Sequence, residues 1–241
     1  KAVFESFCPN ILIHTAAMTN VDECETDKKG CWQLNTKAVE YLITASEKID
    51  CHIVHVSTDF IFDGTHGPLM ETALPNPINY YGESKLEAEK FIMKSACTWA
   101  IARTVLVYGI THNMSRSNII LWVKNSLERG TKIKVVDDQW RTPTLAEDLA
   151  KGCYLLAENK STGIFNISGK DFLTPYDMAI MTAEYFNLDK SLIEKTDGSK
   201  FQQTAKRPPK TGFIINKASN ILGYQPHSFK EGIAILAEQI K

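Results

Sequence analysis

Short apolar segments alternate with longer stretches of helical periodicity in the first hundred residues of this chain. Residues 11–15 (ILIHT), 52–57 (HIVHVS) and 99–104 (WAIART) have the length and composition of buried strands. Residues 27–48, and a segment that ends near Lys94, separate these strands and carry apolar side chains at helical spacing. Because helices connect consecutive strands, the order predicts a parallel sheet covered on both faces.

Beyond Tyr108 the pattern is less regular, and it predicts a smaller C-terminal lobe. The predicted helices are 118–129, 145–159, 174–186 and 229–240, the predicted strands are 132–136 and 163–167, and 196–209 is a polar loop. The predicted fold class is a doubly wound, Rossmann-type α/β fold. We expect residues 1–108 to form the main domain and residues 109–241 mainly the lobe, with about 145–167 returning to the main domain.

The glycine-rich turn that opens a nucleotide-binding domain of this class is missing. The turn normally follows the first strand and holds a pyrophosphate at the start of a helix. The G-x-x-G present here, Gly64–Gly67, follows no clean strand-to-helix junction, and the strand at 11–15 is preceded by the end of a helical segment. The first β-α units of the fold are therefore expected to be absent from these 241 residues.

Composition excludes several classes of partner. The net charge is −1, with acids and bases spread evenly, so neither nucleic acid nor an anionic membrane is expected. The six cysteines show no CxxC or zinc spacing and are interpreted as reduced thiols, and no other set of metal ligands stands out. The apolar runs are too short to span a bilayer, and the chain opens without a signal-like leader. The expected compartment is the cytoplasm.

The segment NYYGESKLEAEKF places Lys85 one helical turn after Tyr81, on the same helix face. Alone, this Tyr-x-x-x-Lys spacing is weak, because Lys85 could equally pair with Glu89 on an exposed face. Gly82 is more informative: glycine in a first helical turn costs up to ~1 kcal/mol relative to alanine, which suggests that another group approaches closely. Tyr80 points elsewhere and is interpreted as a packing or wall residue.

Two strand ends supply groups that complement this pair. The strand at 52–57 leads into Thr58 and Asp59, and small residues follow the strand at 11–15. Because the carboxyl ends of parallel strands form the usual ligand edge, we expect a hydroxyl, a phenol and an ammonium to meet there. The lysine is expected to lower the pKa of Tyr81 toward neutrality, and Thr58 to donate a hydrogen bond to a developing oxyanion. Turn-forming or capping roles remain the alternative for the residues at the strand end.

Longer segments carry a family resemblance. They are HTAAMTNVDECE, QLN, HVSTDFIFDG, PLMETALPNPINYYGESKLEAEK, IARTVLVYG and VVDDQWRTPTLAEDLA, together with KRPPKTGFIINKASNILGYQP near the end. The combination resembles the extended short-chain dehydrogenase/reductase superfamily and, within it, the dTDP-4-dehydrorhamnose reductases. The resemblance covers most of the chain and is far more specific than Tyr-x-x-x-Lys.

The resemblance implies an NAD(P)-binding main domain and an NADPH- or NADH-dependent reductase of a nucleotide-linked 4-keto-6-deoxysugar. It gives Tyr81 the role of proton donor to the sugar C4 oxygen and Lys85 that of a nicotinamide-ribose ligand. Thr58 would polarise the ketone, Asp59 would contact the substrate, and Asn35 would hold a proton-relay water unless its amide is satisfied by backbone. The remaining cofactor contacts implied are Ala16, Ala17, Met18 and Val56.

Some positions depart from the family pattern. Leu106 stands where these reductases usually carry a tryptophan that contacts the sugar. Trp140 and Arg141 are candidates to serve the substrate instead, although a structural ion pair is an equal alternative for Arg141. Arg207 is a further, weaker candidate for a phosphate contact.

Other functions stay open at this point. The same superfamily contains the regulatory β subunit of methionine adenosyltransferase, a non-catalytic binding module, and nucleotide-sugar epimerases. Co-purification with an adenosyltransferase would indicate the regulatory subunit. Turnover without net cofactor consumption would indicate an epimerase. The oligomeric state is also open, with a homodimer among the alternatives.

Overall fold

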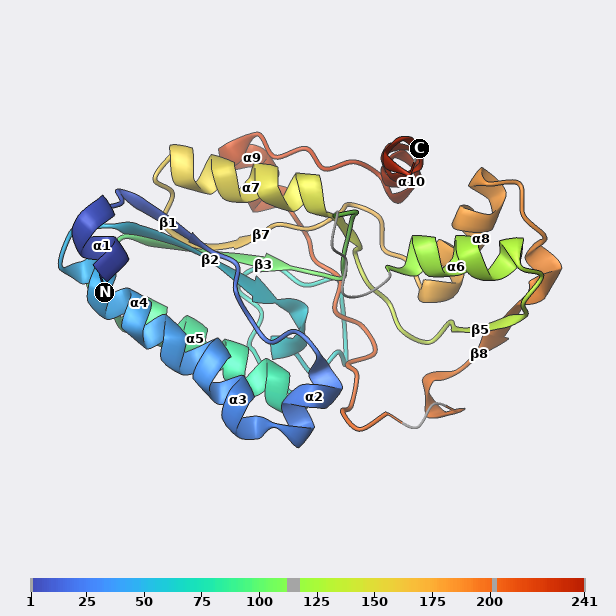
Figure 1. The fold of residues 1–241 in the computed structure, drawn as a ribbon, viewed down its shortest axis with the longest axis horizontal. Coiled ribbons are helices and arrows are strands. Elements are labelled where there is room, and N and C mark those ends of the chain that lie inside the picture. The colour runs from blue at the N-terminus through green and yellow to red at the C-terminus, as the bar shows by residue number, and fades with distance from the viewer. Residues whose placement is uncertain (1, 112–117, 201–202, 241) are drawn as a thin grey trace.

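The centre of the molecule is a four-stranded parallel sheet, seen in a computed structural model that describes residues 2–111, 118–200 and 203–240. In spatial order its strands are β1 (Ile11–His14), β2 (His52–Thr58), β3 (Trp99–Thr104) and β7 (Gly163–Asn166). The strands pair in parallel register, so all four end at the same edge of the sheet. Figure 1 shows that edge facing the second half of the molecule.

Two long helices cover one face of the sheet. They are α4 (Ala38–Glu47) and α5 (Tyr80–Lys94), and α4 is preceded without a break by α3 (Lys28–Trp32) and a π-helical turn, Gln33–Lys37. Their apolar stripes pack on the strands through Val39, Ile43, Ala88, Ile92, Ile53 and Ile101. Each fully buried isoleucine contributes about 1.5–3 kcal/mol relative to an exposed one, so this layer holds the helix that carries the site.

The opposite face is covered by α7 (Ala146–Glu158) and α9 (Asn216–Leu222). Their core contains Val54, Leu156, Phe165, Ile167, Leu222 and Tyr224. Helices therefore lie on both faces, which confirms the predicted α/β fold. The helix at 216–222 was not predicted; it ends at Gly223, which adopts the left-handed conformation that glycine tolerates.

A second region lies beyond the carboxyl ends of the strands and has its own core. It is built from α6 (Ile119–Glu128), β5 (Ile133–Val136), α8 (Pro175–Tyr185) and β8 (Ile193–Thr196). The two strands pair in parallel, and Val123, Val135, Ala179 and Ile193 are buried between them and the helices. Strand β8 was not predicted, because it is only four residues long and its buried and exposed residues do not alternate.

Shorter elements join the two regions. β4 (Val107–Tyr108) pairs with β6 (Thr144–Leu145), and α10 (Phe229–Gln239) packs on Tyr108, Leu145 and Met178. The remaining elements are α1 (Ala2–Phe7), α2 (Val21–Thr26) and 3-10 turns at Asp59–Ile61, Lys190–Leu192 and Gly198–Lys200.

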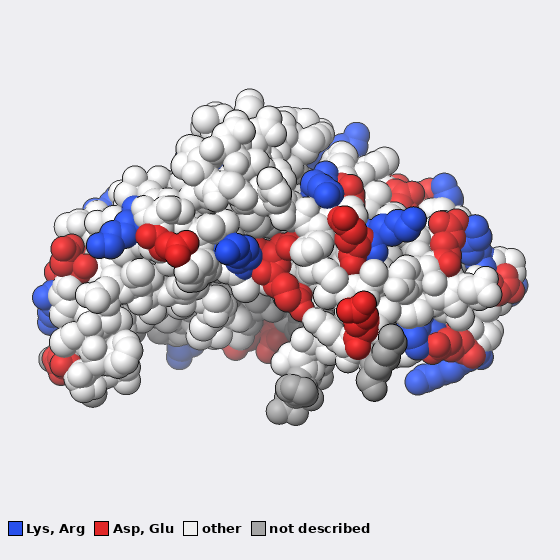
Figure 2. All heavy atoms as spheres, turned by 90° about the horizontal axis from the view of Figure 1, so that it is seen from above, with Lys and Arg blue, Asp and Glu red and all other residues white. Residues whose placement is uncertain are grey.

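The surface carries no segregated charge on the face shown in Figure 2, where acidic and basic side chains alternate. All six cysteines are free. Across residues 2–111, 118–200 and 203–240, no helix combines the length and apolar character needed to cross a membrane.

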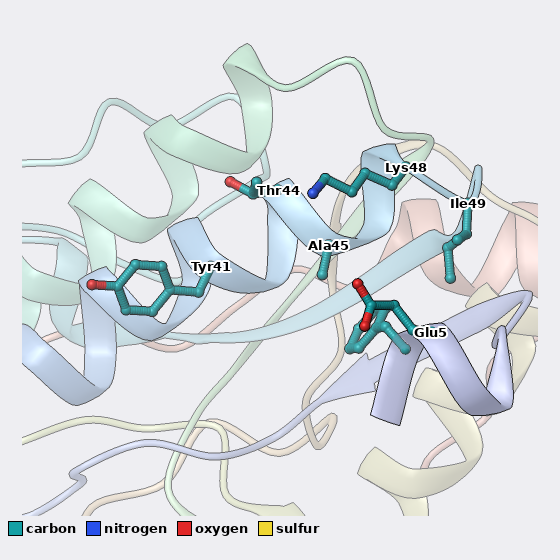
Figure 3. Close-up of a pocket in the computed structure, with 7 residues that line it drawn as sticks. Glu5, Tyr41, Thr44, Ala45, Lys48 and Ile49 are labelled. Carbon is teal, nitrogen blue, oxygen red and sulfur yellow. The ribbon is translucent and has the colours of Figure 1, made fainter. Parts of the chain in front are cut away.

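A hollow of about 380 Å³ lies between α1 and α4, near the amino ends of the strands. Figure 3 shows Glu5 of α1, Tyr41, Thr44 and Ala45 of α4, and Lys48 directly after α4 around it. It is remote from the strand ends at which Thr58 and Tyr81 lie.

Candidate active site

A cavity of about 450 Å³ opens at the carboxyl ends of the strands. Its lining comes from the last residues of β2 and β3, from the segments that follow β1, β2 and β3, and from the first turns of α2, α5 and α7. The residues are Thr15, Ala17, Thr19, Val21, Val56, Ser57, Thr58, Asp59, Phe60, Tyr81, Lys85, Thr104, Leu106, Val107 and Leu149. The sheet topology thus brings Thr58, Tyr81 and Lys85 to one cavity.

The start of α5 is docked tightly against the end of β2. Asn79 caps the helix by accepting a hydrogen bond from the Gly82 amide at 2.8 Å. A Cβ on Gly82 would lie 2.1 Å from the Phe60 carbonyl oxygen, so only glycine permits this approach. The Tyr81 ring then meets Phe60 edge-on at 5.7 Å, beside Thr58. The close approach inferred from Gly82 in the sequence is therefore present.

Tyr81 is buried, with 8% of its surface exposed. Burial raises its pKa well above the ordinary 10, and the side-chain hydrogen bond with Thr58 offsets only part of that rise. The expected lowering of the Tyr81 pKa by Lys85 is thus wrong for this structure, because loss of hydration of the phenolate dominates. The phenol keeps its proton at neutral pH.

Lys85 is buried and directed toward β2 rather than along the helix surface. Its ammonium donates to the Val56 carbonyl at 2.8 Å and contacts Nε2 of His55 at 3.2 Å. Burial lowers the pKa of Lys85 to about 8, and the charge of Glu89 acts against that lowering. An ammonium has three N–H donors, so the contacts with Val56 and His55 engage two and leave one for a ligand in the cavity that Lys85 lines.

Asp59 is a buried residue of the cavity lining and belongs to an internal network. Its carboxylate accepts a hydrogen bond from the Thr211 hydroxyl and lies 3.6 Å from Nε of Arg141. The same guanidinium donates to the carbonyls of Pro208, at 2.7 Å, and Pro209, at 3.2 Å. Arg141 therefore forms the ion pair named as its structural alternative, and a contact between its guanidinium and a substrate phosphate stays a prediction.

The two remaining candidates for substrate contacts, Trp140 and Arg207, also make internal contacts. The Trp140 ring packs against Phe172 at 5.3 Å. Arg207 forms a bidentate pair with Asp22, at 2.7 and 2.6 Å, which ties the 204–207 segment to α2.

Asn35, in the π-helical turn, clamps the loop that follows β1. Its side-chain oxygen accepts from the Met18 amide at 2.8 Å, and its nitrogen donates to the Met18 carbonyl at 3.1 Å and to Ser84 at 3.0 Å. The amide is thus satisfied largely by backbone, the alternative foreseen for it. The clamp holds the loop that contains Ala17, which lines the cavity, whereas the predicted cofactor contacts Ala16 and Met18 are not among the lining residues.

Leu106 lies on the cavity wall with 42% of its surface exposed. It has a φ of 37°, a left-handed conformation that is strained for a leucine. The side chain is therefore held at the cavity mouth by its backbone, between β3 and β4.

Sequence reasoning missed a buried histidine pair. His14 and His55 lie opposite each other on β1 and β2, with their Nδ1 atoms 3.0 Å apart, and His55 contacts Lys85. A histidine in each of two predicted strands was visible in ILIHT and HIVHVS, but only the register between the strands places them together.

A family model described as RmlD substrate binding domain matches residues 1–241. The chain belongs to this family. Two solved dTDP-4-dehydrorhamnose reductases share its fold. The reductase of Clostridium acetobutylicum superposes with a TM-score of 0.92 and is 28% identical to this chain; the alignment covers 99% of this chain and 84% of the reductase. That of Bacillus anthracis, in complex with NADP, has a TM-score of 0.90 and 27% identity, with 99% and 83% covered. The family resemblance is confirmed.

Curated relatives carry two different names. Methionine adenosyltransferase 2 subunit beta of Xenopus tropicalis is 32% identical over 197 residues, which are 79% of this chain and 59% of that protein. dTDP-4-dehydrorhamnose reductase of Aggregatibacter actinomycetemcomitans is 29% identical over 244 residues, covering 96% of this chain and 82% of that protein. The chain spans between 58% and 62% of the length of the first four curated relatives that it matches.

Proposed function

We propose that this chain carries the reaction centre of an NAD(P)H-dependent reductase of a nucleotide-linked 4-keto-6-deoxysugar, with dTDP-4-dehydrorhamnose as substrate. The observation that carries the proposal is the convergence of Tyr81, Thr58 and Lys85 in one cavity at the ligand edge of the sheet. Relatives also support the proposal, because two solved proteins and one curated protein similar to this chain are dTDP-4-dehydrorhamnose reductases.

The residues present fit the nicotinamide-ribose end of a dinucleotide. Ala17 and Val56 offer a flat, small-residue wall, and Lys85 has one N–H that can bind a ribose hydroxyl. A similar reductase is solved with NADP, so NADPH or NADH is the proposed cofactor. When bound, the cofactor supplies a hydride to the sugar C4 carbon.

Tyr81 is the proposed proton donor to the C4 oxygen. Because burial raises its pKa, the phenol is protonated at neutral pH, which suits a general acid in the direction of reduction. Thr58, which now bonds Asp59 at 3.2 Å, would turn its hydroxyl to the same oxygen as negative charge develops there. Asn35 and Arg141 are assigned positioning roles, for the loop after β1 and for Asp59.

Leu106 is the residue proposed to shape the sugar pocket. It is an exposed apolar side chain on the cavity wall, and Trp140 lies outside the residues that line this cavity. A wall built from leucine contacts the sugar through dispersion alone and offers no indole N–H.

The test is oxidation of NADPH and NADH by the full-length protein with a panel of 4-keto nucleotide sugars. Tyr81→Phe should lower kcat by about 10²–10⁴-fold, the usual worth of a positioned general acid, and leave cofactor affinity unchanged. Tyr80→Phe is the matched control, because Tyr80 packs on Trp32 at 6.3 Å outside the reaction centre and should keep its activity. Full turnover by Tyr81→Phe would refute the catalytic assignment.

A regulatory subunit is the second candidate, and two observations favour it. The curated relatives at 32% identity are β subunits of methionine adenosyltransferase, and Leu106 departs from the sugar-contact pattern. Absence of turnover on the whole panel, together with co-purification of an adenosyltransferase, would replace the reductase proposal with this one.

A further inference from the structure

A chain of three buried titratable side chains runs from the cavity to the outer strand of the sheet. The Lys85 ammonium contacts Nε2 of His55 at 3.2 Å, and Nδ1 of His55 lies 3.0 Å from Nδ1 of His14. The two imidazole rings are stacked, with centroids 5.1 Å apart. His55 is fully buried and His14 is 8% exposed, so this is an interior arrangement rather than a surface contact.

The protonation pattern of this chain follows from its geometry. An ammonium is only a donor, so Nε2 of His55 must accept from Lys85, and the His55 proton must then be on Nδ1. That proton is donated to Nδ1 of His14, which places the His14 proton on Nε2. Both rings are neutral, because burial lowers the pKa of His55 well below 6.5 and that of His14 to about 4.

We propose that His55 is a positioning residue, which holds the Lys85 ammonium against the Val56 carbonyl, and that His14 fixes the His55 tautomer able to do so. The inference deepens the proposed function, since it concerns how the ribose-binding lysine of that site is oriented. His55 and Val56 engage two N–H groups of Lys85, and because Lys85 lines the cavity its third N–H is available to a ligand there.

Several charged or titratable groups face Lys85 and influence its pKa. They are His55 from β2, His14 from β1, Glu89 from α5 and Cys31 from α3. Of these, His55 alone contacts the ammonium through an uncharged acceptor. Loss of that acceptor leaves a buried cation less solvated, so the pKa of Lys85 should fall below its present value of about 8.

Two substitutions separate the two contacts of His55. His55→Asn keeps a polar atom where Nδ1 meets His14 but removes the atom that accepts from Lys85. His55→Gln places an amide oxygen near the position of Nε2 and restores an acceptor for Lys85. We expect His55→Asn to raise the KM for NADPH and to move the basic limb of the pH–rate profile by roughly one pH unit toward acid, since a hydrogen bond to a charged group is lost. His55→Gln should restore both.

The matched control is His52→Asn. His52 is a second buried histidine on the same strand, and it contacts the Ser161 carbonyl at 3.0 Å, far from the cavity. A general weakening of β2 would move the control and the His55 variants alike. Equal pH profiles for His55→Asn, His52→Asn and the unaltered protein would overturn the inference while leaving the proposed reductase function intact.

Nitrogen-15 NMR of the histidine rings tests the inference without turnover. We expect His55 as the Nδ1–H tautomer and His14 as the Nε2–H tautomer, both neutral at pH 7. An Nε2–H tautomer of His55 would overturn the inference, because that nitrogen could not accept from Lys85. If no sugar is reduced but the tautomers are as expected, the proposed reductase function fails and the positioning of Lys85 stands.

Discussion

The buried histidine pair makes the fold sensitive to acid. His14 has its pKa lowered from 6.5 to about 4 because burial and the nearby Lys85 charge oppose a second cation. Between these two values the unfolded chain binds a proton that the folded chain does not, so stability rises with pH in this window and is lost as pH falls through it. At about 1.4 kcal/mol for each tenfold change in proton affinity, the loss attributable to His14 is about 2 kcal/mol between pH 7 and pH 5.

The substitution His14→Asn tests this magnitude. The asparagine oxygen can take the place of Nδ1 as acceptor for His55 but cannot titrate. Urea unfolding followed by circular dichroism at pH 7, 6 and 5 gives the free energy of unfolding for both proteins. Carboxylates such as Asp22, whose pKa is lowered from 3.8 to about 2, reduce the stability of the fold only below about pH 4, so they do not obscure the contribution of His14 between pH 7 and pH 5.

We expect the unaltered protein to lose about 2 kcal/mol more than His14→Asn between pH 7 and pH 5. His66→Asn, which replaces an exposed histidine, should follow the unaltered protein. Parallel losses in His14→Asn and the unaltered protein would refute the neutral, buried pair.

The remaining predictions concern the helix that carries Tyr81. Gly82→Ala should destabilise the protein by about 1–3 kcal/mol, because the added Cβ would lie 2.1 Å from the Phe60 carbonyl oxygen. Urea unfolding measures this cost, and an unchanged unfolding midpoint would show that the backbone moves to accommodate the Cβ without loss of stability. Glu89→Gln should cost about 3–5 kcal/mol, since it leaves the buried guanidinium of Arg103 without its bidentate partner at 3.0 and 2.7 Å. Glu87→Gln breaks an exposed pair on the same helix and should cost less than about 1 kcal/mol; equal costs for the two would contradict the role of burial.

The alternation of apolar strands with helices was sufficient to predict the central sheet. β1, β2 and β3 lie where residues 11–15, 52–57 and 99–104 were predicted to form strands. β2 and β3 are buried, as expected for apolar parallel strands, but the prediction that 11–15 is buried was wrong: Ile11 and Ile13 of β1 are exposed. β8 and α9 escaped prediction: they are four and seven residues long, too short for periodicity to stand out, and depend on partners far along the chain.

The position of the candidate site was likewise predictable, because parallel strands end at one edge. The glycine at position 82 predicted a close approach by another group, which in the structure is the Phe60 carbonyl. Thr58, Tyr81 and Lys85 line one cavity, as the order of the strands predicted. What each charged group contacts was not predictable. Arg141 pairs with Asp59 and distant carbonyls, since a guanidinium can reach many acceptors and only packing selects among them.

The sequence by itself determined the fold class and which groups lie at the strand ends, since both follow from local periodicity and chain direction. Only the tertiary structure decided the direction of Lys85, the raised pKa of Tyr81 and the pairing of His14 with His55. The physical reason is that pKa values and hydrogen-bond partners depend on burial and strand register. A register shift of one residue would send His14 to the opposite face of the sheet.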